Sequence, residues 1–209
     1  MRFLDSSEIR LLADSIDPRF RTLVIFTAFT GVRAGEVGAL RWERLDLARG
    51  TADIAEAYSE VHGRLELGPP KTYEHRTVPL PQFLCDLLSE HQQADRRGGL
   101  VFRSATGGPI RHSSFYRRYF KPAVVASGIN PGFRFHDLRH TAAALLIAEG
   151  AHPLAVKERL GHSSITVTMD RYGHLLPALE QQLTESLNGA WRDSAVSQPC
   201  HSGPLDLAR

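Results

Sequence analysis

The sequence predicts a mixed α+β domain that is mainly α-helical and carries a small three-stranded antiparallel sheet. Apolar residues at helical spacing recur along most of the chain, whereas short extended segments bounded by turn residues occur between residues 45 and 80. A length of 209 residues suits one domain, and a hydrophobic content of 42% suffices for a sizeable core. We therefore expect one folded domain over residues 1–189 and a flexible tail over residues 190–209, where Gly, Ser and Pro replace the periodic pattern.

The first two predicted helices have recognisable ends. Residues 5–15 place Asp5 at the N-cap and Glu8 three residues later, which is the pattern of a capping box. The second helix opens at Asp17-Pro18, a cap followed by proline at the first helical position. It is apolar nearly all round until it stops at Gly31, so we expect it to lie deep in the core.

A third helix, from Arg33 to about Leu40, begins just after that glycine. Arg33 and Glu36 are three residues apart and therefore share one helical face. Spacing alone favours a surface ion pair worth a few tenths of a kcal/mol. The alternative is functional: Glu36 would hold the Arg33 guanidinium in a fixed direction toward an anionic ligand.

The predicted sheet lies in the next segment. Residues 45–54 have the pattern of a short hairpin with Gly50 at its turn, and residues 76–80 that of a strand ended by proline. Between them, Lys71 lies in a turn after two prolines. It is either a solvated loop lysine or a mobile ammonium that reaches a site and protonates a departing alkoxide.

Helices are predicted for most of the remaining chain. They cover residues 82–91, 112–127, 135–149, 153–161, 163–172 and 177–188. The helix over 112–127 carries Arg117, Arg118 and Lys121 on one face. This face is either solvated or follows a DNA backbone.

The stretch from His136 to Tyr172 holds the densest set of reactive side chains. His136 and Arg139 are three residues apart, a Leu-Gly-His turn supplies His162, and Tyr172 follows Arg171. Together they offer cationic groups, hydrogen-bond donors and a phenol on helical or turn segments that could converge. Such a set suits attack on a phosphodiester by a side-chain oxygen.

Composition narrows the class of protein further. Lys71, Lys121 and Lys157 are the lysines among 25 basic residues, so the other 22 are arginines. Arginine forks two hydrogen bonds onto a phosphate, although a coding bias would produce the same excess. The N-terminus lacks the apolar segment of a signal peptide and the apolar runs are too short for a membrane span, so we expect a cytoplasmic protein. The two cysteines exclude a disulfide framework.

Four separated motifs resemble the catalytic domain of the tyrosine recombinases, or phage integrases. They read, in order, TGVRAGEVGALRW, PPKTYEHRTVPL, HDLRHTAA and LGHSSITVTMDRYGHLLP. Their order and separation also match, over nearly the whole chain from Leu4 to about Leu187. The resemblance implies the fold of that catalytic domain.

The resemblance also implies a role for each matching position. Arg33 corresponds to the first catalytic arginine and Glu36 to its acidic companion. Lys71 matches the lysine of the sheet turn, and Tyr172 the nucleophile. The remaining catalytic positions are His136, Arg139 and His162. We assign His140 a supporting role in packing or hydrogen bonding, and His136 the acceptance of the tyrosine proton.

The implied reaction is site-specific cleavage and rejoining of double-stranded DNA through a 3′-phosphotyrosyl bond. Fixed arginines stabilise the charge that develops on the phosphate, so we expect no metal or other cofactor. Relatives usually carry an additional DNA-binding domain before the catalytic one. Arg33 lies too near Met1 to leave room for it, so we expect that domain to be absent. The helix over 177–188 resembles the segment that docks on a neighbouring subunit, and packing on its own domain is the alternative.

Two other classes of protein compete with this interpretation. His136 and His140 have the spacing of a zinc-binding helix, but Asp137 replaces the expected glutamate and a third ligand is not evident. The second competitor is a DNA-binding module of the same fold without catalysis, or a topoisomerase-like enzyme that relaxes supercoils by the same chemistry. The complete residue set argues against a module without catalysis.

Overall fold

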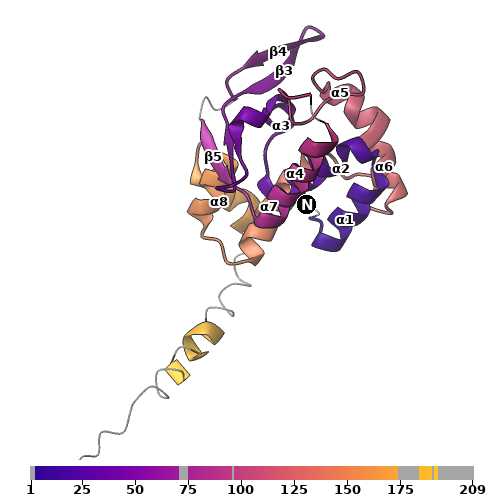
Figure 1. Cartoon of the computed structure of the whole chain (residues 1–209). Coiled ribbons are helices and arrows are strands. Elements are labelled where there is room, and N and C mark those ends of the chain that lie inside the picture. The colour runs from indigo at the N-terminus through magenta and orange to yellow at the C-terminus, as the bar shows by residue number, and fades with distance from the viewer. Residues whose placement is uncertain (1–2, 71–74, 96, 174–183, 190, 193–209) are drawn as a thin grey trace, which may run out of the picture.

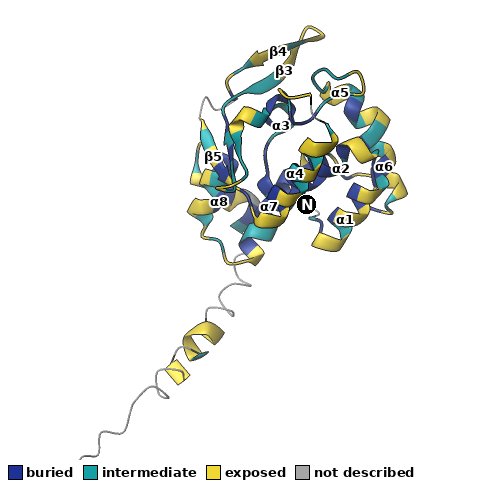
Figure 2. Cartoon of the chain, in the orientation of Figure 1, coloured by how far each residue is buried: buried dark blue, intermediate teal, exposed yellow. Residues whose placement is uncertain are grey.

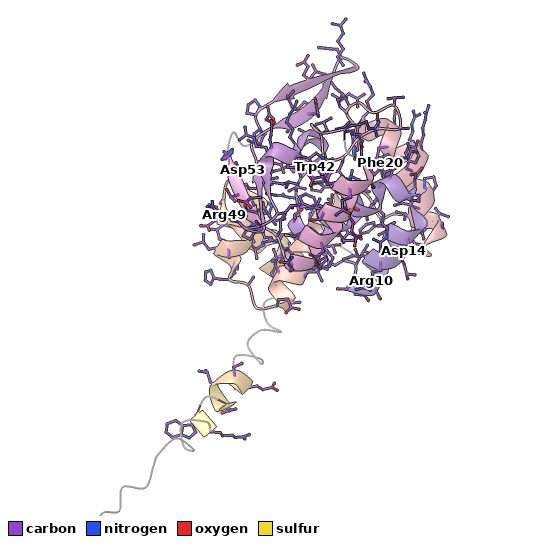
Figure 3. All side chains as sticks on the ribbon, in the orientation of Figure 1. Arg10, Asp14, Phe20, Trp42, Arg49 and Asp53 are labelled. Atoms are coloured by element: carbon purple, nitrogen blue, oxygen red, sulfur yellow. The ribbon has the colours of Figure 1, made fainter. Side chains whose placement is uncertain are left out.

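The computed structural model describes residues 3–70, 75–95, 97–173, 184–189 and 191–192. Across this part of the chain the fold is mixed α+β and mainly helical, as predicted (Figure 1). Charged side chains cover both sides of the domain: Arg49 and Asp53 lie on the side of the sheet, and Arg10 and Asp14 on the first helix (Figure 3). The distribution of charged side chains therefore does not identify a binding face.

The first helix forms as its cap predicts, whereas the Asp17-Pro18 cap opens a 3₁₀ turn and the second α-helix begins three residues later than predicted. Helix α1 (Ser6–Ser15) follows Asp5, whose carboxylate accepts the backbone N–H of Glu8 while the Glu8 carboxylate accepts that of Asp5. A 3₁₀ turn, η1 (Pro18–Phe20), leads into α2 (Arg21–Thr30), which is buried along almost its whole length. Gly31 ends α2 in the left-handed conformation, with φ of 70°.

The predicted three-stranded antiparallel sheet is confirmed. Strands β1 (Leu45–Asp46), β2 (Thr51–Ile54) and β5 (Arg76–Pro79) pair in the order β1-β2-β5. In the register of β2 with β5, Ala52 lies opposite Val78 and both side chains are buried. The sheet therefore contributes one apolar face to the core.

The chain segment that connects β2 to β5 forms a second sheet, which was not predicted from the sequence. Strands β3 (Ala57–Val61) and β4 (Arg64–Gly68) form a hairpin that projects from the body of the domain (Figure 1). His62 and Gly63 make its turn with positive φ angles of 47° and 74°. Most of its side chains are exposed, so the alternation of buried and exposed residues that identifies a strand is weak here.

Further helical segments complete this part of the chain. These are α3 (Ala34–Ala39), the short η2 (Trp42–Arg44), α4 (Gln82–Ala94), α5 (His112–Phe115), η3 (Tyr116–Phe120) and α6 (Lys121–Ala126). The predicted helix over 112–127 is thus three consecutive helical segments. The middle one, η3, is π-helical, a wider turn often found inserted in α-helices.

The last three described helices carry the reactive residues of the His136–Tyr172 stretch. Helix α7 (Asp137–Ala148) packs on α2, α8 (Pro153–Leu160) packs on α7 and β5, and α9 (Ile165–Tyr172) packs on α8. The buried faces of these helices point into the domain (Figure 2). Beside the main core, a small second cluster joins them, made of Ala143, Ile147, Val156, Leu160 and Tyr172.

The C-terminal predictions fall largely outside the described residues. Of the helix predicted over 177–188, residues 177–183 are not described, and residues 184–189 are helical. The tail predicted over 190–209 is described at residues 191–192 alone. No helix within the described ranges is long and apolar enough to cross a membrane.

Substitution of Gly31 tests how closely the end of α2 approaches α8. A Cβ atom at Gly31 would lie 2.3 Å from Leu160 Cδ2, whereas one at Gly128, with a nearly equal φ of 71°, would meet nothing within 4 Å. Both alanine variants incur about 1–2 kcal/mol for the left-handed conformation. We expect Gly31→Ala to lower the free energy of unfolding by a further ~1 kcal/mol or more, measured by urea denaturation. Equal losses in the two variants would contradict the close packing of α2 on α8.

Candidate active site

Arg33 and Glu36 form a buried pair at the start of α3. Arg33 is the N-cap, and its Nη1 donates to Glu36 Oε1 over 2.8 Å while its backbone N–H donates to Oε2 over 2.8 Å. The Glu36 side chain is 1% exposed and that of Arg33 23% exposed. The pair is therefore not the surface ion pair that spacing alone favours, and Glu36 orients the Arg33 guanidinium.

Arg139, in the first turn of α7, is almost completely buried. Its Nη1 donates to the carbonyl of Gly31 over 2.5 Å, and its Nη2 to the carbonyl of Leu160 over 2.6 Å. Burial, together with repulsion from Arg33 and Arg76, lowers the pKa of Arg139 to about 9. The guanidinium therefore stays protonated at neutral pH.

The C-terminal end of α8 connects the two arginines. Gly161 ends the helix in the left-handed conformation, with φ of 65° and ψ of 52°, and its carbonyl accepts from Arg33 Nη2 over 2.9 Å. Arg33 and Arg139 thus bind the carbonyls of two consecutive residues, Gly161 and Leu160. The free carbonyls at a helix C-terminus carry partial negative charge, which favours cations there. Two guanidinium groups that start 106 positions apart in sequence are thereby brought side by side.

His162 follows directly after this turn. Its backbone N–H donates to the carbonyl of Lys157 over 3.0 Å, which closes the end of α8. The ring Nδ1 lies 2.9 Å from Thr168 Oγ1 on α9, and both side chains are buried. His162 therefore directly follows the two carbonyls that the arginines bind, and its imidazole is linked to the helix that carries Tyr172.

Tyr172 is a member of the second apolar cluster. Its side chain is 1% exposed, and its ring lies 6.5 Å from that of Phe3. The hydroxyl lies 2.7 Å from Nδ1 of His140, one turn after His136 on α7. The rings of His136 and His140 meet edge to face at 5.0 Å. The Tyr172 hydroxyl is thus in contact with His140, which was predicted to have a supporting role. His136, the predicted proton acceptor, packs against the His140 ring.

Arg76 is a member of this cluster that the sequence analysis missed. It lies at the start of β5, and its Nη1 and Nη2 donate to the two oxygens of Glu36 over 3.1 and 2.7 Å. Its Nε donates to the carbonyl of Arg159 over 3.1 Å. The sequence pattern placed Arg76 in a strand, and such a pattern predicts the conformation of the backbone but not the contacts of a side chain. The signal that could have identified Arg76 is its position, a cationic residue at the start of a strand within the PPKTYEHRTVPL motif.

The predicted basic residues of the helix over 112–127 lie elsewhere in the domain. Lys71 is outside the described residues. Arg117 and Arg118 are exposed on η3, and the Lys121 ammonium donates to the carbonyl of Pro131. Figure 1 places α5 and α6 on the opposite side of the domain from β5 and α8, so this basic face is separate from the arginine cluster. Its contact with DNA stays a prediction.

The side chains of the described residues do not offer a metal site. Among the residues that the structure describes, no group of three or more His, Cys, Asp or Glu side chains is arranged to hold one. The His136 and His140 rings, which prompted the zinc alternative, pack on each other and toward Tyr172.

Comparisons with known proteins identify the family. The model of the phage integrase family matches residues 2–178. The ICEBs1 integrase of Bacillus subtilis (strain 168) is 30% identical over 185 residues, covering 81% of this chain and 48% of that protein. A XerC-like tyrosine recombinase of Caldanaerobacter subterraneus subsp. tengcongensis is 28% identical over 194 residues, covering 81% and 49% respectively. This chain spans about half the length of these curated relatives.

Solved structures agree on the fold. The Tn1549 transposon integrase (residues 82–397, with a Tyr-to-Phe substitution), solved in complex with transposon right end DNA, superposes with a TM-score of 0.74 at 19% identity. The match covers 88% of this chain and 66% of that one. The architecture is that of a tyrosine recombinase catalytic domain, as predicted. The chain belongs to the phage integrase family.

The buried carboxylate predicts a dependence of stability on pH. Burial by itself raises the pKa of Glu36, but hydrogen bonding and charge pairing with Arg76, and then with Arg33, outweigh it and lower the pKa to about 2. A glutamate in the unfolded chain titrates near ~4.3. The unfolded chain therefore binds more protons between these values, so acidification from pH ~4.3 to ~2 destabilises the folded state.

We expect Glu36→Gln to weaken this dependence. The free energy of unfolding of the wild type should fall more steeply over that interval than that of the variant, in urea titrations at each pH. Parallel curves for the two proteins would show that Glu36 does not carry the depressed pKa.

Proposed function

We propose that this chain is the catalytic domain of a site-specific DNA recombinase that cleaves and rejoins DNA strands through a 3′-phosphotyrosyl intermediate. The observation that carries the proposal is the convergence of Arg33 and Arg139 on the carbonyls of Gly161 and Leu160, next to His162. Membership of the phage integrase family supports the same reaction class.

The two arginines would stabilise the transition state. A phosphodiester resists attack because its anionic oxygens repel nucleophiles and gain charge as the phosphorus becomes five-coordinate. Donors held in place before the reaction stabilise that charge without reorganisation. Arg33 and Arg139 have their directions set by Glu36 and by backbone carbonyls, and a guanidinium has five N–H donors, so each has donors left for a phosphate oxygen. His162 adds a further donor.

Tyr172 would be the nucleophile. A bond forms between its oxygen and phosphorus while the bond from phosphorus to the 5′ oxygen breaks. The phenolic proton passes to a base, for which His136 was expected and His140 is the histidine in contact with the hydroxyl. Lys71 would protonate the leaving 5′ oxygen. Attack by a 5′ hydroxyl on the phosphotyrosyl ester reverses these steps. Because the ester conserves the energy of the broken bond, rejoining the strand requires neither ATP nor a metal.

A movement of α9 is part of this proposal. The Tyr172 side chain is 1% exposed, and its hydroxyl is bonded to His140. A duplex cannot reach an oxygen that is covered by the second apolar cluster. DNA binding would therefore shift α9 away from α7 and α8, and the small size of that cluster keeps the cost of the shift moderate.

Double-stranded DNA is the proposed partner, and the cytoplasm the proposed location. The Tn1549 integrase, which shares the fold, was solved with transposon DNA. Binding through arginines to phosphates depends strongly on salt concentration. Two finer points stay predictions: contact of Arg117 and Arg118 with the DNA backbone, and self-association on DNA through the helix over 177–188.

Removal of the Tyr172 hydroxyl tests the nucleophile. Wild-type chain, at high concentration in low salt, is incubated with nicked duplexes of randomised sequence, which trap a covalent adduct because the short cleaved strand diffuses away. We expect an SDS-stable adduct that mass spectrometry locates on Tyr172, and at least a ~10³-fold lower yield with Tyr172→Phe. DNA binding, measured by fluorescence anisotropy, should change less than ~3-fold.

Tyr58→Phe is the matched control, because Tyr58 lies on β3, outside the cluster. It should form the adduct at the wild-type rate. No adduct with the wild type, or an undiminished adduct with Tyr172→Phe, would refute the proposed chemistry. Relaxation of supercoiled plasmid without a preferred site would favour a topoisomerase-like enzyme instead.

A substrate with a better leaving group tests the role of Lys71. A thiolate departs without protonation, so a 5′-phosphorothiolate at the cleavage site does not need a general acid. We expect Lys71→Ala to slow adduct formation on the ordinary substrate by ~10²–10⁴-fold and to approach the wild-type rate on the sulfur substrate. An equal defect on both substrates would remove Lys71 from the role of acid.

A further inference from the structure

Arg76 connects three elements that each carry part of the site. It lies on β5, its two Nη atoms bind both oxygens of Glu36 on α3, and its Nε binds the carbonyl of Arg159 near the end of α8. Its side chain is 9% exposed, compared with 23% for Arg33. The Arg76 guanidinium is therefore the more deeply buried of the two that pair with Glu36.

We propose that Arg76 is a positioning residue for strand cleavage: it fixes the direction of the Arg33 guanidinium through Glu36, and it holds the Leu160-Gly161-His162 turn in place. This inference rests on the proposed function, whose phosphate-binding arginine is Arg33.

The Glu36 carboxylate is hydrogen-bonded at both of its oxygens. Oε1 of Glu36 accepts from Nη1 of Arg33 and from Nη1 of Arg76, and Oε2 accepts from the Arg33 backbone N–H and from Nη2 of Arg76. Arg76 thus supplies one of these two bonds at each oxygen, in the forked geometry that guanidinium and carboxylate share. Without Arg76, the remaining bonds of the carboxylate both come from Arg33 itself, so β5 no longer helps to fix the direction of the Arg33 guanidinium.

Arg76 also contacts the turn at the end of α8. Arg76 Nε binds the carbonyl of Arg159, and a Cβ atom at Gly161 would lie 3.1–3.2 Å from Cδ, Nε and Nη1 of Arg76. The stem of Arg76 therefore packs against the residue whose carbonyl binds Arg33. The next residue is His162, so one side chain supports both the arginine and the histidine of the site.

The donors of Arg76 distinguish positioning from contact with the substrate. Nε, Nη1 and Nη2 of Arg76 all donate to protein atoms. Lysine cannot replace them, because an ammonium is a compact charge that lacks the planar fork. The proposal therefore predicts that charge alone at position 76 does not restore the site.

The test uses Arg76→Gln and Arg76→Lys, with Arg44→Gln as the matched control. Arg44 pairs with Asp53 over 3.7 Å, and its side chain is 42% exposed. The first measurement is ¹⁵N NMR of the Arg33 guanidinium in the full chain without DNA. We expect slow rotation of the Arg33 guanidinium in the wild type and in Arg44→Gln, and fast rotation in both Arg76 variants.

The second measurement is the rate of adduct formation on the nicked duplexes. We expect Arg76→Gln to lower the rate ~10²-fold, as loss of one aligned donor does, with DNA affinity changed less than ~3-fold. On an Arg33→Ala background the same substitution should cost less than ~3-fold more, because the two residues act as one unit.

Each outcome decides a separate point. Unchanged Arg33 rotation in a folded Arg76 variant, full additivity with Arg33→Ala, or wild-type rates in Arg76→Lys would overturn the positioning role. Loss of the fold in both Arg76 variants, followed by thermal unfolding, would assign Arg76 to stability and also overturn it. Absence of an adduct in the wild type would instead count against the proposed function, while the NMR measurement still judges Arg76.

Discussion

The arrangement of this domain depends on one buried carboxylate. Glu36 is 1% exposed, and an ionised carboxylate in such a place costs several kcal/mol unless its oxygens are bonded and its charge is paired. Arg33 and Arg76 meet both requirements from different elements, α3 and β5. The sheet, the start of α3 and, through the carbonyl of Arg159, the end of α8 are therefore held at fixed distances by one group of charges.

Backbone carbonyls stabilise the buried positive charge that Glu36 does not pair. Arg139 is 3% exposed, and it binds carbonyls at the ends of α2 and α8. Both helices end at glycines with positive φ, Gly31 and Gly161, which turn the chain and leave the last carbonyls free to accept. Partial charges of this kind stabilise a guanidinium without neutralising it, so the cluster keeps a net positive charge that a second carboxylate would reduce.

Tyr172 combines two demands that conflict. As an aromatic ring it completes the apolar cluster that joins α9 to α7 and α8, which stabilises the domain without a ligand. As a nucleophile it must present its oxygen to a phosphate. Its hydroxyl contacts His140, while Ile165 and Met169 on the same helix are exposed. The stability of the ligand-free domain and access to the nucleophile therefore depend on the same few contacts.

Local chemistry in the sequence determined most of the described helices and the three-stranded sheet. The capping pair Asp5–Glu8, the glycines that end α2 and α8, and the spacing of Arg33 and Glu36 act within one turn of chain, so their patterns can be read directly. The motifs of the family added which residues belong together. Three features were decided by the tertiary structure alone. Glu36 is buried, Arg76 reaches it from 40 residues away, and His140 meets Tyr172 across 32 residues. A hydrogen bond between distant residues leaves no periodic trace in sequence, because it depends on how packed elements are placed in space.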